Sequence, residues 1–181
     1  LMHEYAIAQG LLAPDAPFVS FNCAQYANNP ELLAANLFGY VKGAFTGAQG
    51  DKAGAFEAAN GGMLFLDEVH RLNAEGQEKL FPWLDRKEIY RVGETAQGLP
   101  VSLRLVFATT EDIHSTFLTT FIRRIPILIS LPDLQHRSRH EKEALMLQFF
   151  WQEARTLNAR LQLTPRLLQG LTHYVYRGNV G

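Results

Sequence analysis

An apolar run that ends in two acidic residues constrains the fold of this chain more than any other feature. The run is Met63 to Leu66, and Asp67 and Glu68 follow it directly. This pattern is typical of a central parallel strand, buried on both faces, with catalytic groups at its carboxyl end. Because side chains alternate across a strand, the two carboxylates should point in different directions. The run therefore predicts a parallel sheet with a chemical site at the end of one strand, although a solvated strand end remains the simpler alternative.

Three further short apolar runs are predicted as buried strands, at residues 18–21, 103–108 and 125–131. Helices are predicted between them from apolar spacing and capping residues, at residues 1–9, 30–38 and 73–85. Pro82 should bend or interrupt the third of these helices, and turn residues over 88–100 predict a hairpin. Strands that alternate with helices indicate an α/β fold with a doubly wound parallel sheet.

Two more helices are predicted beyond the fourth strand. Ser138 and Glu141 form a capping box, and a threonine cap followed by proline occurs at residues 164–165. The predicted division is an α/β subdomain and the start of a small helical lid, at residues 1–133 and 134–181.

The composition excludes several classes of protein. With 47% hydrophobic and 19% charged residues, the chain is globular rather than disordered. Seventeen basic against eighteen acidic residues leave no basic field for DNA binding by this piece. No apolar run approaches the roughly 20 residues of a membrane helix, so no membrane partner is expected. The single cysteine, Cys23, is expected to be a buried thiol in a reducing, cytoplasmic setting, and the scattered histidines form no metal site of usual spacing.

A glycine-rich stretch lies between two predicted helical regions. Residues 43–48 read Gly-Ala-Phe-Thr-Gly-Ala, which cannot supply a layer of core. The stretch is either a plain turn or a mobile loop that presents Phe45 and Thr46 to a partner. The candidate contact residues are Gly43, Ala44, Phe45, Thr46, Gly47 and Ala48.

This hexapeptide and the blocks around it resemble the AAA+ domain of bacterial enhancer-binding proteins, the activators that remodel RNA polymerase bound to the sigma-54 factor. The blocks keep the family's order, at residues 18–24, 37–39, 54–59, 61–68, 91–93, 104–110 and 178–180. The resemblance implies a ring-shaped homo-oligomer, a hexamer, that hydrolyses ATP between subunits with Mg²⁺. It also implies that the 43–48 loop pushes against the sigma-54 factor, and that DNA is bound by a domain outside this chain.

The resemblance further implies a role for each polar residue at the strand ends. Asp67 holds magnesium through water, and Glu68 activates the attacking water. Asn22 hydrogen-bonds the catalytic glutamate, whereas from its own position it reads as a turn residue. Thr109 and Thr110 occupy the two positions that sense the γ-phosphate in the family. The family usually has asparagine where this chain has Thr110, so Thr110 is interpreted equally well as a β-former at a strand end.

Several departures from the family pattern keep a second function open. Arg124 aligns with the second of two arginines that stabilise phosphate charge across the subunit interface, but the first falls near Leu118 and is missing. Arg123 either substitutes for it or is a solvated charge. The chain ends Gly-Asn-Val-Gly, at 178–181, where the family has arginine last, and it contains no G-x-x-x-x-G-K-[ST] phosphate-binding loop.

The alternatives are an ATPase module whose phosphate-binding loop lies outside these residues and a binding module that engages the sigma factor without turnover. In either case the 181-residue chain alone is expected to lack tight ATP binding. Another AAA+ machine, such as a helicase loader, would lack the 43–48 hexapeptide. The departures also resemble the subgroup of activators typified by the levanase operon regulator, which carries phosphotransferase-system regulatory domains.

Overall fold

The computed structural model describes residues 1–174, apart from the side chain of His173. It divides into two compact units, Leu1–Ile127 and Leu128–Gly181. None of the described helices is long and apolar enough to cross a membrane.

The first unit is built on a three-stranded parallel sheet with the strand order β1-β2-β5, whose strands are β1 (Phe18–Asn22), β2 (Met63–Asp67) and β5 (Arg104–Phe107). Leu64 and Leu66 of the central strand are fully buried, as the uniformly apolar run predicts. Asn22 lies in register with Asp67, so the carboxyl ends of β1 and β2 meet at one edge of the sheet. The parallel α/β fold is confirmed, and three of the four predicted strands are present; β2 is buried as predicted, whereas β1 and β5 are only partly buried.

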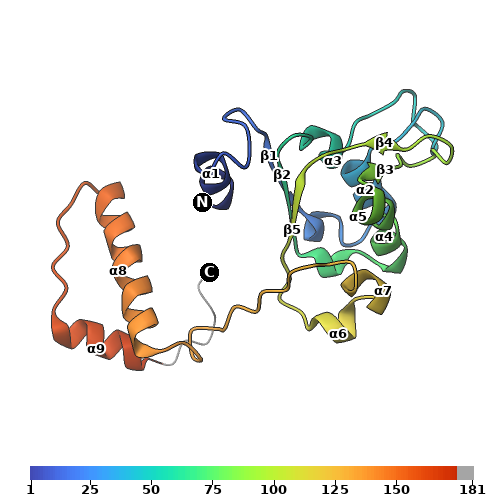
Figure 1. The fold of residues 1–181 in the computed structure, drawn as a ribbon. Helices are drawn as coiled ribbons and strands as arrows, with labels where there is room; N and C mark the ends of the chain where they lie inside the picture. The colour runs from blue at the N-terminus through green and yellow to red at the C-terminus, as the bar shows by residue number, and fades with distance from the viewer. Residues whose placement is uncertain (175–181) are drawn as a thin grey trace. The chain divides into compact units, whose positions relative to one another are not determined.

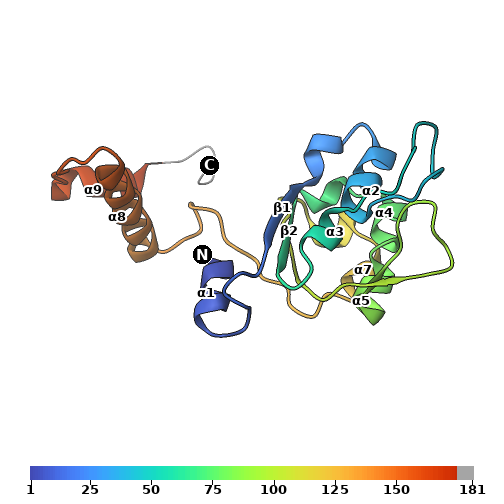
Figure 2. The ribbon, with the colours of Figure 1, turned by 90° about the horizontal axis from the view of Figure 1, so that it is seen from above.

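Short helices cover this sheet on both sides. Those up to the hairpin are α1 (Met2–Ala8), η1 (Cys23–Tyr26), α2 (Pro30–Phe38), α3 (Ala55–Ala58), η2 (Val69–Arg71), α4 (Ala74–Glu78) and α5 (Phe81–Arg86). Those after it are α6 (Ile113–Thr116) and α7 (Thr119–Ile122). In Figures 1 and 2, α1 lies on the opposite side of the sheet from α2, α3 and α5. The main core forms on the α2–α5 side, where Phe38 and Phe56 stack with ring centroids 5.5 Å apart.

The helix predicted from Asn73 onward is broken in two, as expected from Pro82. The Asn73 side chain accepts a hydrogen bond from Gly76 N and begins α4, and Pro82 lies in the first turn of α5, where its missing N–H costs nothing. The predicted hairpin is also present, because β3 (Glu88–Ile89) pairs antiparallel with β4 (Leu99–Pro100).

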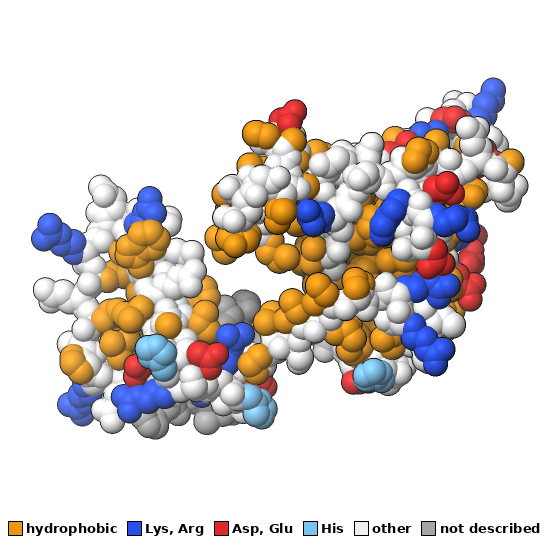
Figure 3. Space-filling model, in the orientation of Figure 1, with side chains coloured by type: hydrophobic (Ala, Val, Ile, Leu, Met, Phe, Trp, Pro, Cys, Tyr) orange, Lys and Arg blue, Asp and Glu red, His pale blue; other side chains and the backbone are white. Residues whose placement is uncertain are grey.

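The strand predicted at residues 125–131 is wrong in this structure. No sheet of the described residues contains that segment, and β5 has a neighbouring strand only on its β2 side. Its apolar side chains are 53–77% exposed at Ile127, Leu128, Ile129 and Leu131, and Figure 3 shows hydrophobic surface along the segment that follows α7. Apolar β-formers are not sufficient for a strand, since the backbone groups also need a partner strand.

The second unit contains the two predicted helices, α8 (Arg139–Thr156) and α9 (Pro165–His173). The capping box is formed, with Ser138 and Glu141 each bonded to the other's backbone N–H, and Thr164 caps α9 through Leu167 N. The unit boundary falls at 127/128, whereas the predicted subdomain boundary at 133/134 stays a prediction. The Gly-Asn-Val-Gly ending at 178–181 lies outside the described residues.

Candidate functional site

The carboxyl ends of the three parallel strands bring polar side chains from distant parts of the sequence together. Asn22 ends β1, Asp67 ends β2, and Thr109 follows β5. Asn22 Nδ2 donates to Asp67 Oδ2 at 3.4 Å. This edge of an open parallel sheet is where α/β proteins bind ligands.

Asn22 fills the turn-residue role, and its amide reaches the acidic pair without a bond to Glu68. Its Oδ1 accepts from Ala24 N at 2.8 Å, which caps the turn into η1, while its amide nitrogen contacts the acidic pair. The resemblance implies that the amide bonds the catalytic glutamate, but in the structure its partner is Asp67. The other Asp67 oxygen accepts from Glu68 N at 3.0 Å, so both carboxylate oxygens have a donor.

Glu68 has a left-handed backbone, with φ 52° and ψ 41°. A residue with a Cβ pays of order 1 kcal/mol or more for this conformation, which concentrates at functional sites. The left-handed turn directs the chain from β2 into η2, and the Glu68 side chain keeps 28% of its surface exposed. Its carboxylate Oε2 lies 3.5 Å from His70 Nε2.

His70 is the residue that sequence reasoning missed. Its ring is 8% exposed, and its Nδ1 lies 3.1 Å from Thr109 Oγ1, so it connects the end of β5 to Glu68. Among six scattered histidines no spacing distinguishes it; only the strand order β2-β5 reveals that His70 and Thr109 are neighbours. Thr110 is exposed, with no side-chain hydrogen bond among the described residues.

Cys23 lies immediately below this polar edge and is completely buried. Burial, and secondarily the negative charge of Asp67, raise the pKa of the Cys23 thiol to about 12 from an ordinary value of 9.0. The prediction of a buried thiol is confirmed, and the thiol is the protonated, unreactive form of cysteine at neutral pH.

We expect the Cys23 thiol to be masked from thiol reagents in the folded chain. At pH 8 a pKa near 12 leaves about a thousandfold less thiolate than an ordinary cysteine has, and burial reduces access further. Labelling with a chromogenic disulfide at pH 8, with and without urea, measures this; equal rates would contradict it. Because the folded pKa is raised, the free energy of unfolding should be unaffected by Cys23 below pH 9 and fall between pH 9 and 12.

The hexapeptide at 43–48 forms a closed loop between α2 and α3. Gly43 N donates to Ala48 O at 2.9 Å, and both glycines of the loop have positive φ, 82° and 100°. Phe45 is 42% exposed and meets Tyr40 edge-on at 4.9 Å, and Thr46 is exposed. The expected exposure of both side chains is confirmed, whereas Ala48 is buried at 7% because the loop closes over its small side chain.

The base of this loop is fixed by an ion pair. Arg91 donates to both oxygens of Glu57, at 2.9 and 2.6 Å, and reaches Asp51 at 3.5 Å. Single β-bridges join Tyr40 to Lys52 and to Val92. Tyr40 therefore connects the start of the loop both to the residues that follow the loop and to the β3–β4 turn. Figures 1 and 2 show both segments at the same end of the first unit.

The same base depends on close backbone contact between two glycines. A Cβ placed on Gly54 would lie 2.3 Å from Gly39 N and 2.5 Å from Phe38 C. These neighbours are backbone atoms and cannot rotate away, so only glycine permits α2 to end against the start of α3.

Substitution of Gly54 by alanine should therefore destabilise the fold, by about 3 kcal/mol for forced backbone movement in a packed region. Gly50→Ala is the matched control, because a Cβ there meets nothing within 4 Å and the backbone is not left-handed. Urea unfolding of both variants tests the prediction. Equal midpoints for the two would show that the glycine contact is not tight.

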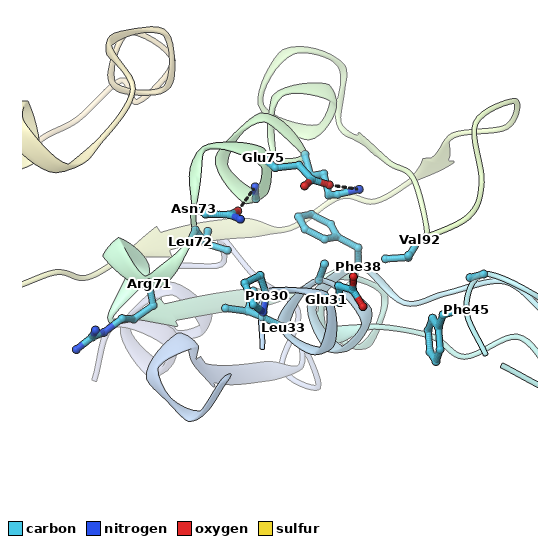
Figure 4. Close-up of a pocket in the computed structure, with 14 residues that line it drawn as sticks. Pro30, Glu31, Leu33, Phe38, Phe45, Arg71, Leu72, Asn73, Glu75 and Val92 are labelled. Carbon is cyan, nitrogen blue, oxygen red and sulfur yellow. Dashed lines mark hydrogen bonds and ion pairs between the residues drawn. The ribbon is translucent and has the colours of Figure 1, made fainter. Parts of the chain in front are cut away.

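A cavity of about 280 Å³ lies beside the loop rather than at the acidic edge. Its lining comes from α2, the loop, and the segment from η2 to α4, and in Figure 4 Phe45 and Arg71 lie toward opposite ends of it. The Glu75–Lys79 ion pair, at 3.6 Å, stands on one wall. Because neither Asp67 nor Glu68 lines it, the cavity is not the candidate phosphate site.

The two candidate arginines differ in what holds them. Arg124 Nε donates to Asp85 at 2.9 Å, its Nη1 donates to Thr120 O at 2.8 Å, and its guanidinium stacks 4.2 Å from the Phe81 ring centre. Arg123 is exposed, with no side-chain partner among residues 1–174. Of the two, Arg123 is free to reach another molecule.

The donor set at the acidic edge suits a hard cation held largely by water. No group of three metal-ligating side chains occurs in the described part of the chain. One carboxylate with remaining waters is a usual arrangement for Mg²⁺, which dehydrates reluctantly. Asp67 therefore fits an outer-sphere or single-ligand role.

A parallel sheet flanked by helices, with acidic and hydroxyl groups at its carboxyl edge, defines an α/β protein. Its likeness to a solved structure shows that the fold is that of the AAA+ ATPases. NtrX from Brucella abortus, solved in complex with ADP, superimposes with a TM-score of 0.74 at 26% identity, over 98% of this chain and 40% of NtrX. The sigma-54 interaction domain matches residues 4–127, and the chain belongs to that family.

Two relatives cover essentially the whole chain. It is 44% identical to the transcriptional regulatory protein LevR of Bacillus subtilis over 99% of its length, and 46% identical to DagR of Salmonella typhimurium over 100%. These matches support the levanase-regulator-like subgroup. The chain spans only 19% of the length of each relative.

Proposed function

We propose that this chain is the ATP-hydrolysing AAA+ module of a sigma-54-dependent transcriptional activator. The observation that carries the proposal is the meeting of Asn22, Asp67, Glu68 and Thr109 at one sheet edge, in a chain of the sigma-54 interaction family. Phosphoryl transfer needs such a set, because it relies on positioning and charge stabilisation more than on covalent chemistry.

Each residue then has a separate task. Asp67, held by Asn22 and by the Glu68 N–H, binds Mg²⁺ through water, and the ion neutralises phosphate charge when bound. Glu68 orients the attacking water and accepts its proton. Thr109 and Thr110 face the γ-phosphate, and the exposed Thr110 hydroxyl supplies one hydrogen bond where the family has an amide.

The proposal includes assembly and a partner. In a hexameric ring, Arg123 reaches the phosphate bound to a neighbouring subunit. This role is supported by the exposed Arg123 side chain, which has no partner among the described residues. Residues 134–181 act as part of the helical lid. The loop at 43–48 contacts the sigma-54 factor, and DNA is bound elsewhere in the whole protein.

A binding module without turnover is the second candidate. It is favoured by Arg124, whose guanidinium is occupied by Asp85 and Phe81 within its own chain instead of being free for a phosphate. In that case the loop would engage the sigma factor while the acidic edge stays inactive.

The test is steady-state ATP turnover by the assembled full-length protein, measured together with transcription from a sigma-54 promoter. Turnover that rises with ring assembly, together with activation, supports the ATPase. Sigma-factor binding with no turnover at saturating Mg-ATP would replace it with the binding module.

A further inference from the structure

His70 occupies a position between the two groups that the reaction must coordinate. It lies in η2, with Nδ1 3.1 Å from Thr109 Oγ1 and Nε2 3.5 Å from Glu68 Oε2. No other side chain among the described residues contacts the Glu68 carboxylate within hydrogen-bond or ion-pair distance. The ring is nearly buried, whereas Glu68 is partly exposed.

The direction of the Thr109–His70 contact depends on the tautomer of His70, because the Thr109 hydroxyl can donate one hydrogen bond and accept two. Thr109 Oγ1 already accepts a hydrogen bond from Glu111 N at 3.1 Å, so its single proton is free to be donated to His70 Nδ1. A neutral histidine whose Nδ1 accepts carries its proton on Nε2, the ring nitrogen that lies 3.5 Å from Glu68 Oε2. With the proton on Nε2, the tautomer that the proposal takes, the contacts run from the Glu111 backbone through Thr109 and His70 to Glu68.

We propose that His70 is a positioning residue that makes the orientation of Glu68 depend on whether Thr109 is bound to a γ-phosphate. The inference rests on the proposed ATPase function. A hydroxyl has one proton, so Thr109 cannot donate to a phosphate oxygen and to His70 Nδ1 at the same time. When the γ-phosphate takes that proton, His70 loses its fixed partner and releases Glu68 from the resting position.

A buried histidine that only fills space is the competing explanation. It would explain the low exposure of the ring, but it gives no reason why both ring nitrogens meet groups of the sheet edge. A space-filling role also gives no reason why Glu68 adopts a costly left-handed backbone conformation in which its carboxylate contacts His70.

The experiment compares His70→Ala with His114→Ala, an exposed histidine of α6 used as the matched control, in the full-length protein. His70→Ala should lower kcat for ATP about tenfold with KM nearly unchanged. It should also raise the affinity for a non-hydrolysable ATP analogue relative to ADP about fivefold, since the phosphate no longer competes for the Thr109 proton. His114→Ala should change neither.

A double-variant cycle separates this inference from a structural role. In a Thr109→Val background, His70→Ala should leave the analogue-to-ADP affinity ratio unchanged, because the shared hydroxyl is absent. If His70→Ala folds poorly, His70→Leu replaces it; the leucine side chain fills the space of the ring and has neither donor nor acceptor, so the ratio should still rise.

An unchanged affinity ratio in a folded His70 variant overturns the inference even where kcat falls. Wild-type protein that binds nucleotide without hydrolysing it would overturn the proposed function instead, and the affinity ratio would still test the link between His70 and Thr109.

Discussion

Glutamine in place of Glu68 is expected to abolish ATP hydrolysis by the full-length protein, with a loss on the order of 10²-fold or more in turnover. The amide preserves the size of the side chain and the His70 contact can persist, but an amide cannot accept a proton from water. Asp67 and its two donors remain in place, so nucleotide binding with magnesium should stay within a few-fold of wild type. Turnover and nucleotide affinity must therefore be measured on the same preparation.

The matched control for this change is Glu78→Gln, which removes an exposed carboxylate of α4. It should leave turnover unchanged, as surface substitutions usually do. If Glu68→Gln lowers turnover by less than a few-fold, Glu68 does not orient the attacking water. A comparable loss in both glutamine variants would instead indicate a general charge effect.

Thr46→Ala is expected to separate hydrolysis from activation. Thr46 is exposed at the tip of a loop whose closure uses backbone bonds, such as Gly43 N to Ala48 O. Removing its hydroxyl should change the free energy of unfolding by no more than about 0.5 kcal/mol. ATP turnover should persist, but binding to the sigma-54 factor in the hydrolysis transition state, and promoter opening, should be lost.

The decisive measurement for Thr46 pairs ATP turnover with transcription from one sigma-54 promoter. Thr156→Ala, an exposed threonine near the end of α8, provides the control and should leave both readouts unchanged. Normal activation by the Thr46 variant would remove the loop from the mechanism. Loss of turnover as well would mean that the substitution disturbs the site or the assembly.

Sequence reasoning succeeded where a local pattern carries the structural information. The strands β1, β2 and β5 were predictable because each is a short run rich in apolar β-formers, and the central strand β2 is uniformly apolar as expected of burial on both faces. The helices with side-chain caps, at Asn73, Ser138 and Thr164, were predictable because an oxygen in the right place satisfies the first free N–H groups.

Prediction from the sequence failed where the structure of a segment depends on which other segments pack or pair with it. Residues 125–131 have the composition of a strand, but no strand of the described sheet pairs with them. His70 could not be singled out, because its partner Thr109 is 39 residues away and the two meet only through the pairing of β2 with β5. The partner of Asn22 differed for a similar reason, since the parallel register sets Asn22 beside Asp67.

The exposed segment Ile127 to Leu131 and the unpaired side of β5 have a consequence for handling the protein at the bench. Within the described residues, an open strand edge and an exposed apolar segment are each a template for nonspecific self-association. Light scattering or sedimentation of the 181-residue chain at high concentration should report polydisperse particles that shrink in mild detergent. A particle mass measured in this way is evidence for a ring only if the mass changes when nucleotide is added and stays the same in detergent.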